Sequence, residues 1–477
     1  MSITASYTLP QLWMPAWNPI IYSFVSDKIN EPNFSYVVDV YIGAPTIPSI
    51  GFPTLRLFQR QSASGNCMVD VSNIVQTYFS MSNWFGTETG AVGGPAYAKY
   101  GNTLTPGSSL WNSVVEVLIR VGEQYNVGGV PTIFNGTTNT VGSPTYTLSS
   151  NYTGSAARCL PGAIPYPQSV SNITAASVST CFYNPYIMDG NGLFLTRAGL
   201  TQNIMLGQHH SLSFLNQWDD APGSYAYSVQ GIEVIYYNSA GGVISSTFIY
   251  NNTGAGGGPQ TANNYTAVTY ALTTAVLQVA IGPRNLTVPA GAAYYTVQAY
   301  RKSSATASTT PGTACSALYR FNLVTPPCSD LYPVVRVAWL NDLGGRDYYN
   351  FTMLYEKTTN SESDSWSQTN VNWDGQYAYP LTQNGDWWLR GGPKTFNKVV
   401  KTSYVLQTDW LSQAEVDFLG QIPESSQVWA YVGQNVDQPE SIKITNVEYT
   451  YSTVAQQKLV QVTLECEYSK PQPKQNL

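Results

Sequence analysis

A hairpin pattern between Val334 and Leu354 constrains the fold of this chain more than any other stretch. Apolar residues occupy every second position from Val335 to Trp339, which predicts a strand with one apolar and one polar face. The pattern returns after Gly344-Gly345, a pair that can adopt the positive φ of a tight reversal. We therefore predict a β-hairpin, a structural element by its periodicity, with the charge pair Arg346-Asp347 just past its turn.

Strand-length segments with similar alternation recur along the 477 residues, separated by glycine, proline and asparagine. Such spacing is typical of β-sandwiches. Further strands are predicted at Tyr22–Ser26, Phe34–Ile42, Thr54–Gln59, Val114–Tyr125, Ser211–Leu215, Val229–Tyr237, Val243–Tyr250, Thr269–Ala280, Tyr294–Tyr300, Val399–Thr408, Val428–Val432, Ile442–Tyr451 and Leu459–Tyr468.

Two short helices are expected among these strands. The first should begin near Asp70, and either Asp70 or Ser72 can cap it. The second should run over Ser412–Gln421, because Ser412 and Glu415 have the spacing of a capping box. Pro423 is expected to end this second helix.

The distribution of charge divides the chain into three parts, since more than half of the charged residues lie in the last third. We predict an N-terminal β-sandwich-like domain with one short helix at 1–150, a middle β-sandwich domain at 151–330, and a C-terminal β-rich domain at 331–477. The expected fold class is mainly β, with tandem immunoglobulin-like β-sandwich domains and a C-terminal α+β domain that carries one short helix.

Charged residues make up only 10% of the chain, against roughly 25% in ordinary soluble domains. The net charge is -6 and no basic run occurs, which argues against nucleic acid as a partner. The N-terminus lacks the features of a signal peptide, and no apolar run reaches the ~18 residues of a membrane span. We expect synthesis in a cytoplasm and no membrane insertion.

The spacing of the cysteines and histidines in the sequence does not predict a metal site. The six cysteines form no CxxC, and without a secretion signal we interpret them as free or partly buried thiols. The only histidines, His209-His210, are adjacent, so on a strand they point to opposite faces and cannot jointly hold a metal. We interpret them as a structural or surface pair.

No catalytic or cofactor-binding residue is predicted either. Asp219-Asp220 could form a hydrolase carboxylate pair, but they stand before Pro222-Gly223, as acidic turn residues often do. The sequence has no G-x-S-x-G motif, and Gly254–Gly258 lacks the Lys-Ser/Thr of a phosphate loop.

The polar insertion Asn360–Trp388 is the best binding candidate because it is rich in aromatic residues. Tryptophan and tyrosine are enriched at protein interfaces and can also stack on sugars. A third interpretation is that they cover the core of the last domain. The candidate contact residues are Trp366, Trp373, Tyr377, Tyr379, Trp387 and Trp388.

Several motifs together resemble virion proteins of tailed phages. They are Trp339-Leu340-Asn341 with Gly344-Gly345, Asp347 and Phe351; Asp409–Glu415 with Ser425–Val428 and Glu465–Tyr468; and, near the N-terminus, Trp17–Ile20, Asn33–Asp39 and Val69–Ile74. Over most of its length the chain resembles tail and baseplate-associated proteins of phages that infect Bacteroidetes. This resemblance brings no catalytic residues.

The resemblance implies a structural protein of the virion tail tip, baseplate or neck that works by oligomeric assembly. Its partners would be copies of itself and other virion proteins, and it would be made in the host cytoplasm. An alternative is a receptor-binding or glycan-binding adhesin at the tail tip, with a host surface receptor or glycan as partner. An enzyme would depend on Asp219 and Asp220, and we expect none.

Overall fold

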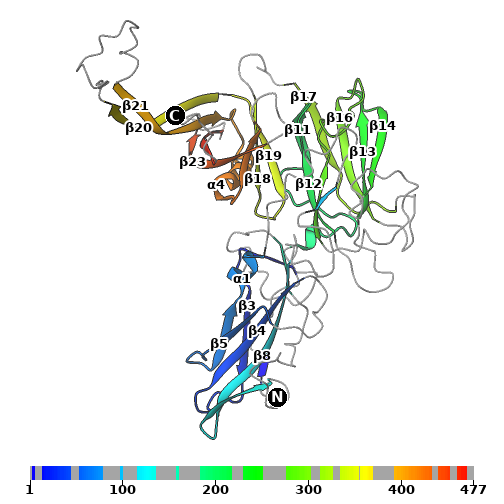
Figure 1. The fold of residues 1–477 in the computed structure, drawn as a ribbon. Helices are drawn as coiled ribbons and strands as arrows, with labels where there is room; N and C mark the ends of the chain where they lie inside the picture. Colours follow the sequence, from blue (N-terminus) through cyan, green and yellow to red (C-terminus); the bar gives the residue numbers. More distant parts are fainter. Residues whose placement is uncertain are drawn as a thin grey trace, which may run out of the picture. The chain divides into compact units, whose positions relative to one another are not determined.

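The structure is a computed structural model, and it is mainly β (Figure 1). It describes residues 3–5, 13–43, 53–78, 97–99, 115–135, 157–160, 183–216, 229–250, 275–301, 312–325, 334–353, 355–368, 392–431, 439–451 and 459–469. The predicted fold class, several β-sheets with a short helix near the C-terminus, is confirmed.

The first two sheets share one hydrophobic core and so form a sandwich. Phe24 and Val69 from one sheet pack in the same cluster as Val38 and Ile119 from the other. The smaller sheet has the order β1 (Ile3–Ala5), β3 (Ile21–Ser26), β6 (Asn66–Asp70). The larger has the order β2 (Trp13–Pro15), β10 (Ala157–Leu160), β8 (Val115–Val127), β4 (Ser35–Gly43), β5 (Leu55–Gln59), with β9 (Val130–Asn135) also paired to β8.

A second sandwich is built around another shared core. Val234 and Tyr295 of a five-stranded sheet pack in one cluster with Phe214 and Val279 of a three-stranded sheet. The five-stranded sheet has the order β11 (Thr201–Met205), β17 (Tyr319–Val324), β16 (Tyr294–Arg301), β13 (Val229–Tyr237), β14 (Val243–Tyr250). The three-stranded sheet has the order β12 (Ser211–Asn216), β15 (Ala275–Ala280), β7 (Tyr97–Lys99).

The last third of the chain forms a single seven-stranded sheet with two short helices against it. Its order is β19 (Arg346–Phe351), β18 (Val335–Leu340), β22 (Val428–Tyr431), β23 (Glu440–Tyr451), β24 (Val460–Tyr468), β21 (Gly392–Gln407), β20 (Tyr355–Gln368). Val416 and Leu419 of helix α3 (Gln413–Leu419) and Ile422 of α4 (Gln421–Glu424) join the core of this sheet.

By its contacts the chain divides into two compact units, and the hairpin contributes to both. The first unit contains Met1–Thr325 and Leu340–Tyr348, and the second contains Pro326–Trp339 and Tyr349–Leu477. The turn of the hairpin therefore belongs with the sandwiches, while the remainder of its strands belongs with the seven-stranded sheet. The division into three domains at 150 and 330 stays a prediction.

The hairpin is confirmed, but its predicted polar face is not. The turn closes with hydrogen bonds from Asn341 N to Gly345 O, 2.9 Å, and from Gly344 N to Asn341 O, 3.1 Å, with Gly344 at φ 83°. All six residues of β18 are buried, including Arg336, whose Nη1 donates to Asn350 Oδ1. Alternation failed here because both faces of the strand are covered.

The helices follow the prediction with two differences. Ser412 and Glu415 form the expected capping box, and Ser412 N donates to Glu415 Oε2 at 2.9 Å. Pro423 does not end the helical region but lies inside α4, as its third residue, where a backbone N–H would have no acceptor within the helix. Helix α1 (Ser72–Gln76) has Val71 as its N-cap residue, while Asp70 Oδ1 accepts from Ser72 N at 2.9 Å.

Candidate functional site

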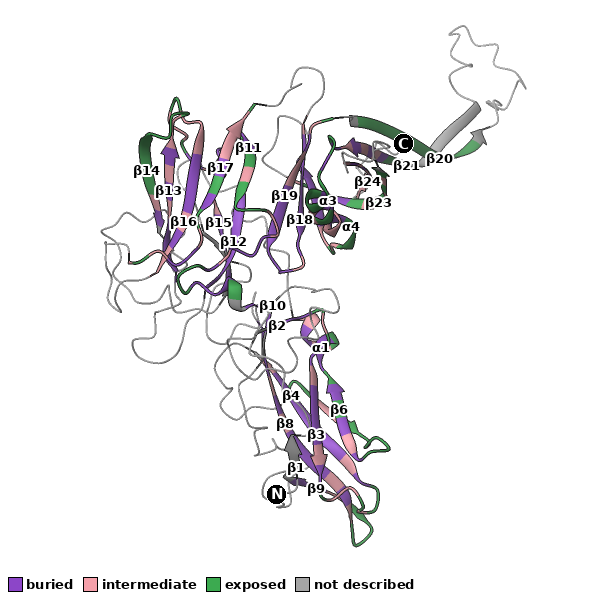
Figure 2. Cartoon of the chain, turned by 180° about the vertical axis from the view of Figure 1, so that it is seen from behind, coloured by how far each residue is buried: buried purple, intermediate pink, exposed green. Residues whose placement is uncertain are grey.

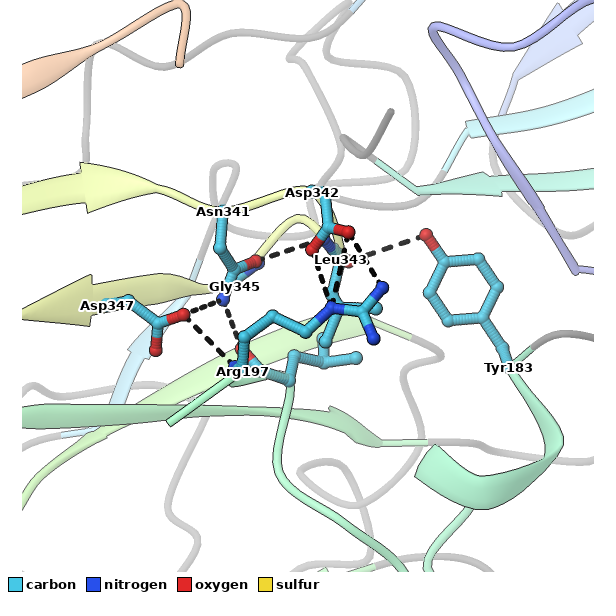
Figure 3. Close-up of polar contacts among 8 residues, drawn as sticks. Tyr183, Arg197, Asn341, Asp342, Leu343, Gly345 and Asp347 are labelled. Carbon is cyan, nitrogen blue, oxygen red and sulfur yellow. Dashed lines mark hydrogen bonds and ion pairs between the residues drawn. The ribbon is translucent and has the colours of Figure 1, made fainter. Parts of the chain in front are cut away.

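The hairpin turn carries a buried polar cluster, formed by Asn341, Asp342, Asp347, Thr196 and Arg197 and named here the turn cluster. Figure 3 shows Arg197 together with the three hairpin residues. Asn341 lies at the centre of the turn cluster. Its Oδ1 accepts from Gly345 N at 2.8 Å and from Leu343 N at 3.1 Å, while its Nδ2 donates to Leu195 O and to Asp347 Oδ2, both at 2.9 Å. An amide has two donors and two acceptor positions, so this side chain is fully used.

Asp347 is 2% exposed and accepts three hydrogen bonds. The donors are the Thr196 hydroxyl, the Asn341 amide and the backbone N–H of Arg197. Burial raises the pKa of Asp347 from 3.8 to about 6, although the three hydrogen bonds act in the opposite direction. The carboxylate is therefore held in place by donors from the chain itself.

Arg197 and Asp342 form the charged end of the cluster. Arg197 Nε donates to Asp342 Oδ1 at 2.9 Å and Nη2 donates to Asp342 Oδ2 at 2.7 Å, a bidentate pair in which both side chains are partly buried. Two parallel hydrogen bonds between a guanidinium and a carboxylate fix the relative orientation of the two side chains in addition to pairing their charges. Arg197 thus attaches to the hairpin turn through both its side chain and its backbone.

Close packing completes this attachment. A Cβ placed on Gly345 would lie 1.8 Å from the carbonyl oxygen of Leu195, far inside van der Waals contact. Only glycine allows the turn to approach that backbone so closely. The turn cluster therefore holds the hairpin turn against the segment 195–197 through hydrogen bonds within the chain.

A second candidate is a two-stranded ribbon, named here the arm, formed by Asn360–Gln368 of β20 and Gly392–Lys401 of β21 (Figure 1). Strand β21 pairs with β24 only from Ser403 to Gln407, and among the described strands the arm has no third strand. Every residue of β20 from Glu356 to Trp366 is exposed (Figure 2). Within the described part of the chain, the arm is therefore a ribbon of two strands.

The structure places one of the six predicted contact residues. Trp366 is 47% exposed and lies on the arm opposite Lys394. The segment Asn360–Gln368 was expected to be part of a polar insertion but continues β20 as a strand. Trp373, Tyr377, Tyr379, Trp387 and Trp388 lie outside the described residues.

The histidines are buried inside the second sandwich. His209 Nδ1 and Asn285 Oδ1 lie 3.1 Å apart, and the His210 ring packs 4.7 Å from the Tyr348 ring. Both histidines are at most 5% exposed. These contacts support the structural interpretation of the pair.

The described cysteines are buried. Cys67, Cys315 and Cys466 are free, and burial raises the pKa of each to about 12, so their thiols stay protonated at neutral pH. Cys159 is also buried. Cys181, Cys328, Asp219-Asp220 and Gly254–Gly258 lie outside the described residues.

Two further features are absent from the part of the chain that the structure describes. No group of three or more histidine, cysteine, aspartate or glutamate side chains is arranged to hold a metal ion there. Within the same residues, every helix is too short or too polar to cross a membrane.

The turn cluster was only half visible in the sequence. Asn341 and Asp347 belong to the hairpin pattern, but Thr196 and Arg197 lie some 150 residues earlier, outside any predicted strand. Asp347 was expected in a charge pair beside the turn and is instead buried against these distant residues. The weak signal available was an arginine among apolar residues in a chain poor in charge.

No protein family and no curated protein matches this sequence. Among solved structures, one similar chain comes from the tail of an empty GTA particle with C6 symmetry. The TM-score is 0.16 and the identity 11%, over 26% of this chain and 81% of that chain. A likeness of this size assigns neither a fold nor a role.

Proposed function

We propose that this protein is a structural component of a tailed-phage virion, located in the tail tip, baseplate or neck, that acts by oligomeric assembly. The observation that carries the proposal is the arm, in which β20 is exposed from Asn360 to Trp366 and which has no third strand among the described strands. The partners would be copies of this chain and other virion proteins. We further propose that the phage infects Bacteroidetes, as the sequence motifs imply, and that the protein has no catalytic activity.

An isolated two-stranded ribbon is marginally stable in water, because it has no hydrophobic face covered by a third element. The arm nevertheless includes nine residues of β20, all of which lie beyond the last pairing of β21 with β24. A neighbouring subunit can supply the missing strand or surface. The arm is therefore best explained as a contact element of a larger assembly.

The composition agrees with such a role. Only 10% of the residues are charged, while 13% are aromatic. Interface cores are depleted in charged residues and enriched in aromatic ones, because burying a charge requires its dehydration. A chain of this composition can bury large surfaces against neighbours at low electrostatic cost.

The test compares two exposed tryptophans in phage particles. Trp366→Ala on the arm should reduce the amount of this protein in purified virions at least several-fold, as measured by quantitative mass spectrometry. The control is Trp410→Ala, since Trp410 is 45% exposed but lies outside the arm. Absence of the wild-type protein from purified virions would overturn the proposal.

The exposed Trp366 also favours a second candidate, an adhesin that binds a host receptor or glycan. An exposed indole can stack on the face of a sugar ring. Under this alternative, Trp366→Ala would leave incorporation into virions unchanged and abolish binding to host cells or to a glycan array. The adhesin alternative would be contradicted if Trp366→Ala were no longer incorporated into virions while the purified variant still bound host cells or glycans.

A further inference from the structure

The five-stranded sheet of the second sandwich has one face that points away from the core, and four neighbouring strands place a row of polar and aromatic side chains on it (Figure 1). Tyr295, Phe321 and Ile204 lie in the core, and successive residues of a strand point to opposite faces. Their chain neighbours therefore point outward. From one strand to the next, the row consists of Tyr237 of β13, Tyr294 of β16, Asn322 of β17 and Asn203 of β11, paired in the strand registers.

Arg320 of β17 lies on the same face and is held in one orientation by two members of the row. Its guanidinium carbon lies 3.8 Å from the centroid of the Tyr294 ring, and its Nε donates to Asn322 Oδ1 at 2.9 Å. The Tyr237 ring stacks on the Tyr294 ring, with 4.9 Å between centroids and 8° between planes, and so fixes the ring that supports the guanidinium. A stacked guanidinium of this kind holds its two Nη groups in a fixed plane.

The two asparagines continue the hydrogen bonds of Arg320 across the sheet. Asn322 Nδ2 donates to Asn203 Oδ1 at 3.2 Å, so each amide oxygen accepts from the preceding residue of the chain of bonds. An amide carries two N–H groups and a guanidinium five, so further N–H groups remain on all three side chains. Arg320 and Asn203 are exposed and Asn322 is half-buried. These three residues, named here the donor patch, thus present hydrogen-bond donors at the surface.

The donor patch also carries a positive charge on a chain whose net charge is -6. None of the ion pairs among the described residues includes Arg320. A guanidinium in a fixed plane is complementary to a carboxylate, which accepts two parallel hydrogen bonds from it. Nucleic acid would require clustered positive charge, and Arg320 is the one cation of the patch. A ligand with single carboxylate groups fits this charge best.

We propose that the donor patch binds an acidic sugar, with the sugar carboxylate on the Nη groups of Arg320 and sugar hydroxyls on the amides of Asn322 and Asn203. Uncharged amide groups suit hydroxyls, which both donate and accept hydrogen bonds. Thr201 lies opposite Arg320, is exposed, and can supply a further hydroxyl. The inference goes beyond the proposed assembly function, and it gives the adhesin alternative a binding site on a different element from Trp366.

The test is binding of the purified full-length chain to an array of uronic acid and sialic acid oligosaccharides, each printed beside its methyl ester. The ester removes the negative charge and leaves the rest of the sugar unchanged. Wild type should bind at least one of the acids at least about tenfold more tightly than its ester, because hydrogen bonds to a charged group are the stronger ones. Equal binding to acids and esters, or binding to none of the acids, would overturn the proposal.

Variants of Arg320 assign the binding to the donor patch. Arg320→Gln should weaken binding of the same acidic oligosaccharide at least about tenfold, and Arg320→Lys should not restore it, because lysine keeps the charge but lacks the planar pair of donors. Arg60→Gln is the matched control, since Arg60 is exposed next to β5 of the first sandwich, and it should bind as wild type. Full binding by Arg320→Gln or Arg320→Lys would contradict the assignment.

Tyr294 should act as a positioning residue through Arg320. Tyr294→Leu removes the ring against the guanidinium and should weaken binding several-fold, whereas Tyr294→Phe keeps the ring and should bind as wild type. Equal losses in the two variants would assign the effect to the hydroxyl group and contradict a role for the ring.

The outcomes separate this inference from the proposed function. If wild type binds acidic sugars through Arg320 but is absent from purified virions, the inference stands and the proposed function falls. If Arg320→Gln leaves binding to the array unchanged but lowers the amount of this protein in virions, the donor patch contacts another protein, and the inference is wrong while the assembly function stands.

Discussion

Asn341 organises the hairpin turn because one side chain satisfies four backbone or side-chain partners that would otherwise be buried without hydrogen bonds. Asp347 extends this network to Thr196 and Arg197. The result is a turn fixed by contacts from a distant segment rather than by its own glycines alone. Gly345 contributes by having no Cβ to collide with Leu195.

Asp347 should make stability depend on pH. Its pKa in the folded protein, about 6, lies above its ordinary value of 3.8, so the folded state binds the proton more tightly than the unfolded state. Stability should therefore rise as the pH falls through 6 and level off below 4, by about 3 kcal/mol from this group. Other carboxyl groups also titrate in this range, so the contribution of Asp347 must be isolated by comparison with a variant.

Asp347→Asn provides that comparison, because an amide of similar shape does not titrate. Urea denaturation of both proteins between pH of about 7.5 and about 4.5 should show the stability of wild type improving relative to the variant as the pH falls. Parallel stability curves for the two proteins would show that Asp347 has an ordinary pKa in the folded state.

Among the residues of the turn cluster, the sequence identified those of the hairpin but not their distant partners. The hairpin pattern located Asn341, Gly344 and Asp347 correctly along the chain. Nothing local identified Thr196 and Arg197 as their partners, because periodicity describes the faces of one element and carries no information on which distant segment covers them. The burial of Arg346 and Asp347 follows from that coverage.

Strands were the most predictable elements. Strands β13 and β14 have the predicted bounds, because alternation and turn residues delimit them on both sides. The arm was missed as a strand because Asn360–Gln368 is almost entirely polar, so no apolar alternation marks it. A strand without a buried face gives no periodic signal, and its pairing with β21 becomes visible only in the structure.

This polar composition predicts how the arm behaves in the free protein. Because the arm has no third strand among those that the structure describes, its backbone hydrogen bonds should open more readily than those of the surrounding sheet. In hydrogen–deuterium exchange of the isolated chain, Asn360–Gln368 should exchange much faster than Thr463–Glu467 of β24, which pair with both β21 and β23. In intact virions the same segment should become protected. Equal protection of the arm in the free chain and in virions would contradict its role as a contact element.

The whole molecule combines several hydrophobic cores with a surface that is poor in charge. Each sandwich and the seven-stranded sheet has its own core, so stability does not require the exposed apolar residues. Phe58, Val130 and Val243 each remain more than half exposed. Contacts between copies should therefore be dominated by apolar burial and strand pairing, with a small electrostatic contribution.

Salt dependence distinguishes this mode of association from one driven by charge. Raising the salt concentration from about 0.05 M to about 0.5 M screens ion pairs between exposed groups but leaves apolar burial intact. We expect the self-association constant of the purified chain, measured by sedimentation equilibrium, to change less than about threefold over this range. An association between complementary charged surfaces would instead lose affinity steeply as salt is added. The four charged residues of β20 would be the first candidates for such a charged contact. A steep decrease would show that charged surfaces make the main contact, because salt screens interactions between exposed charges.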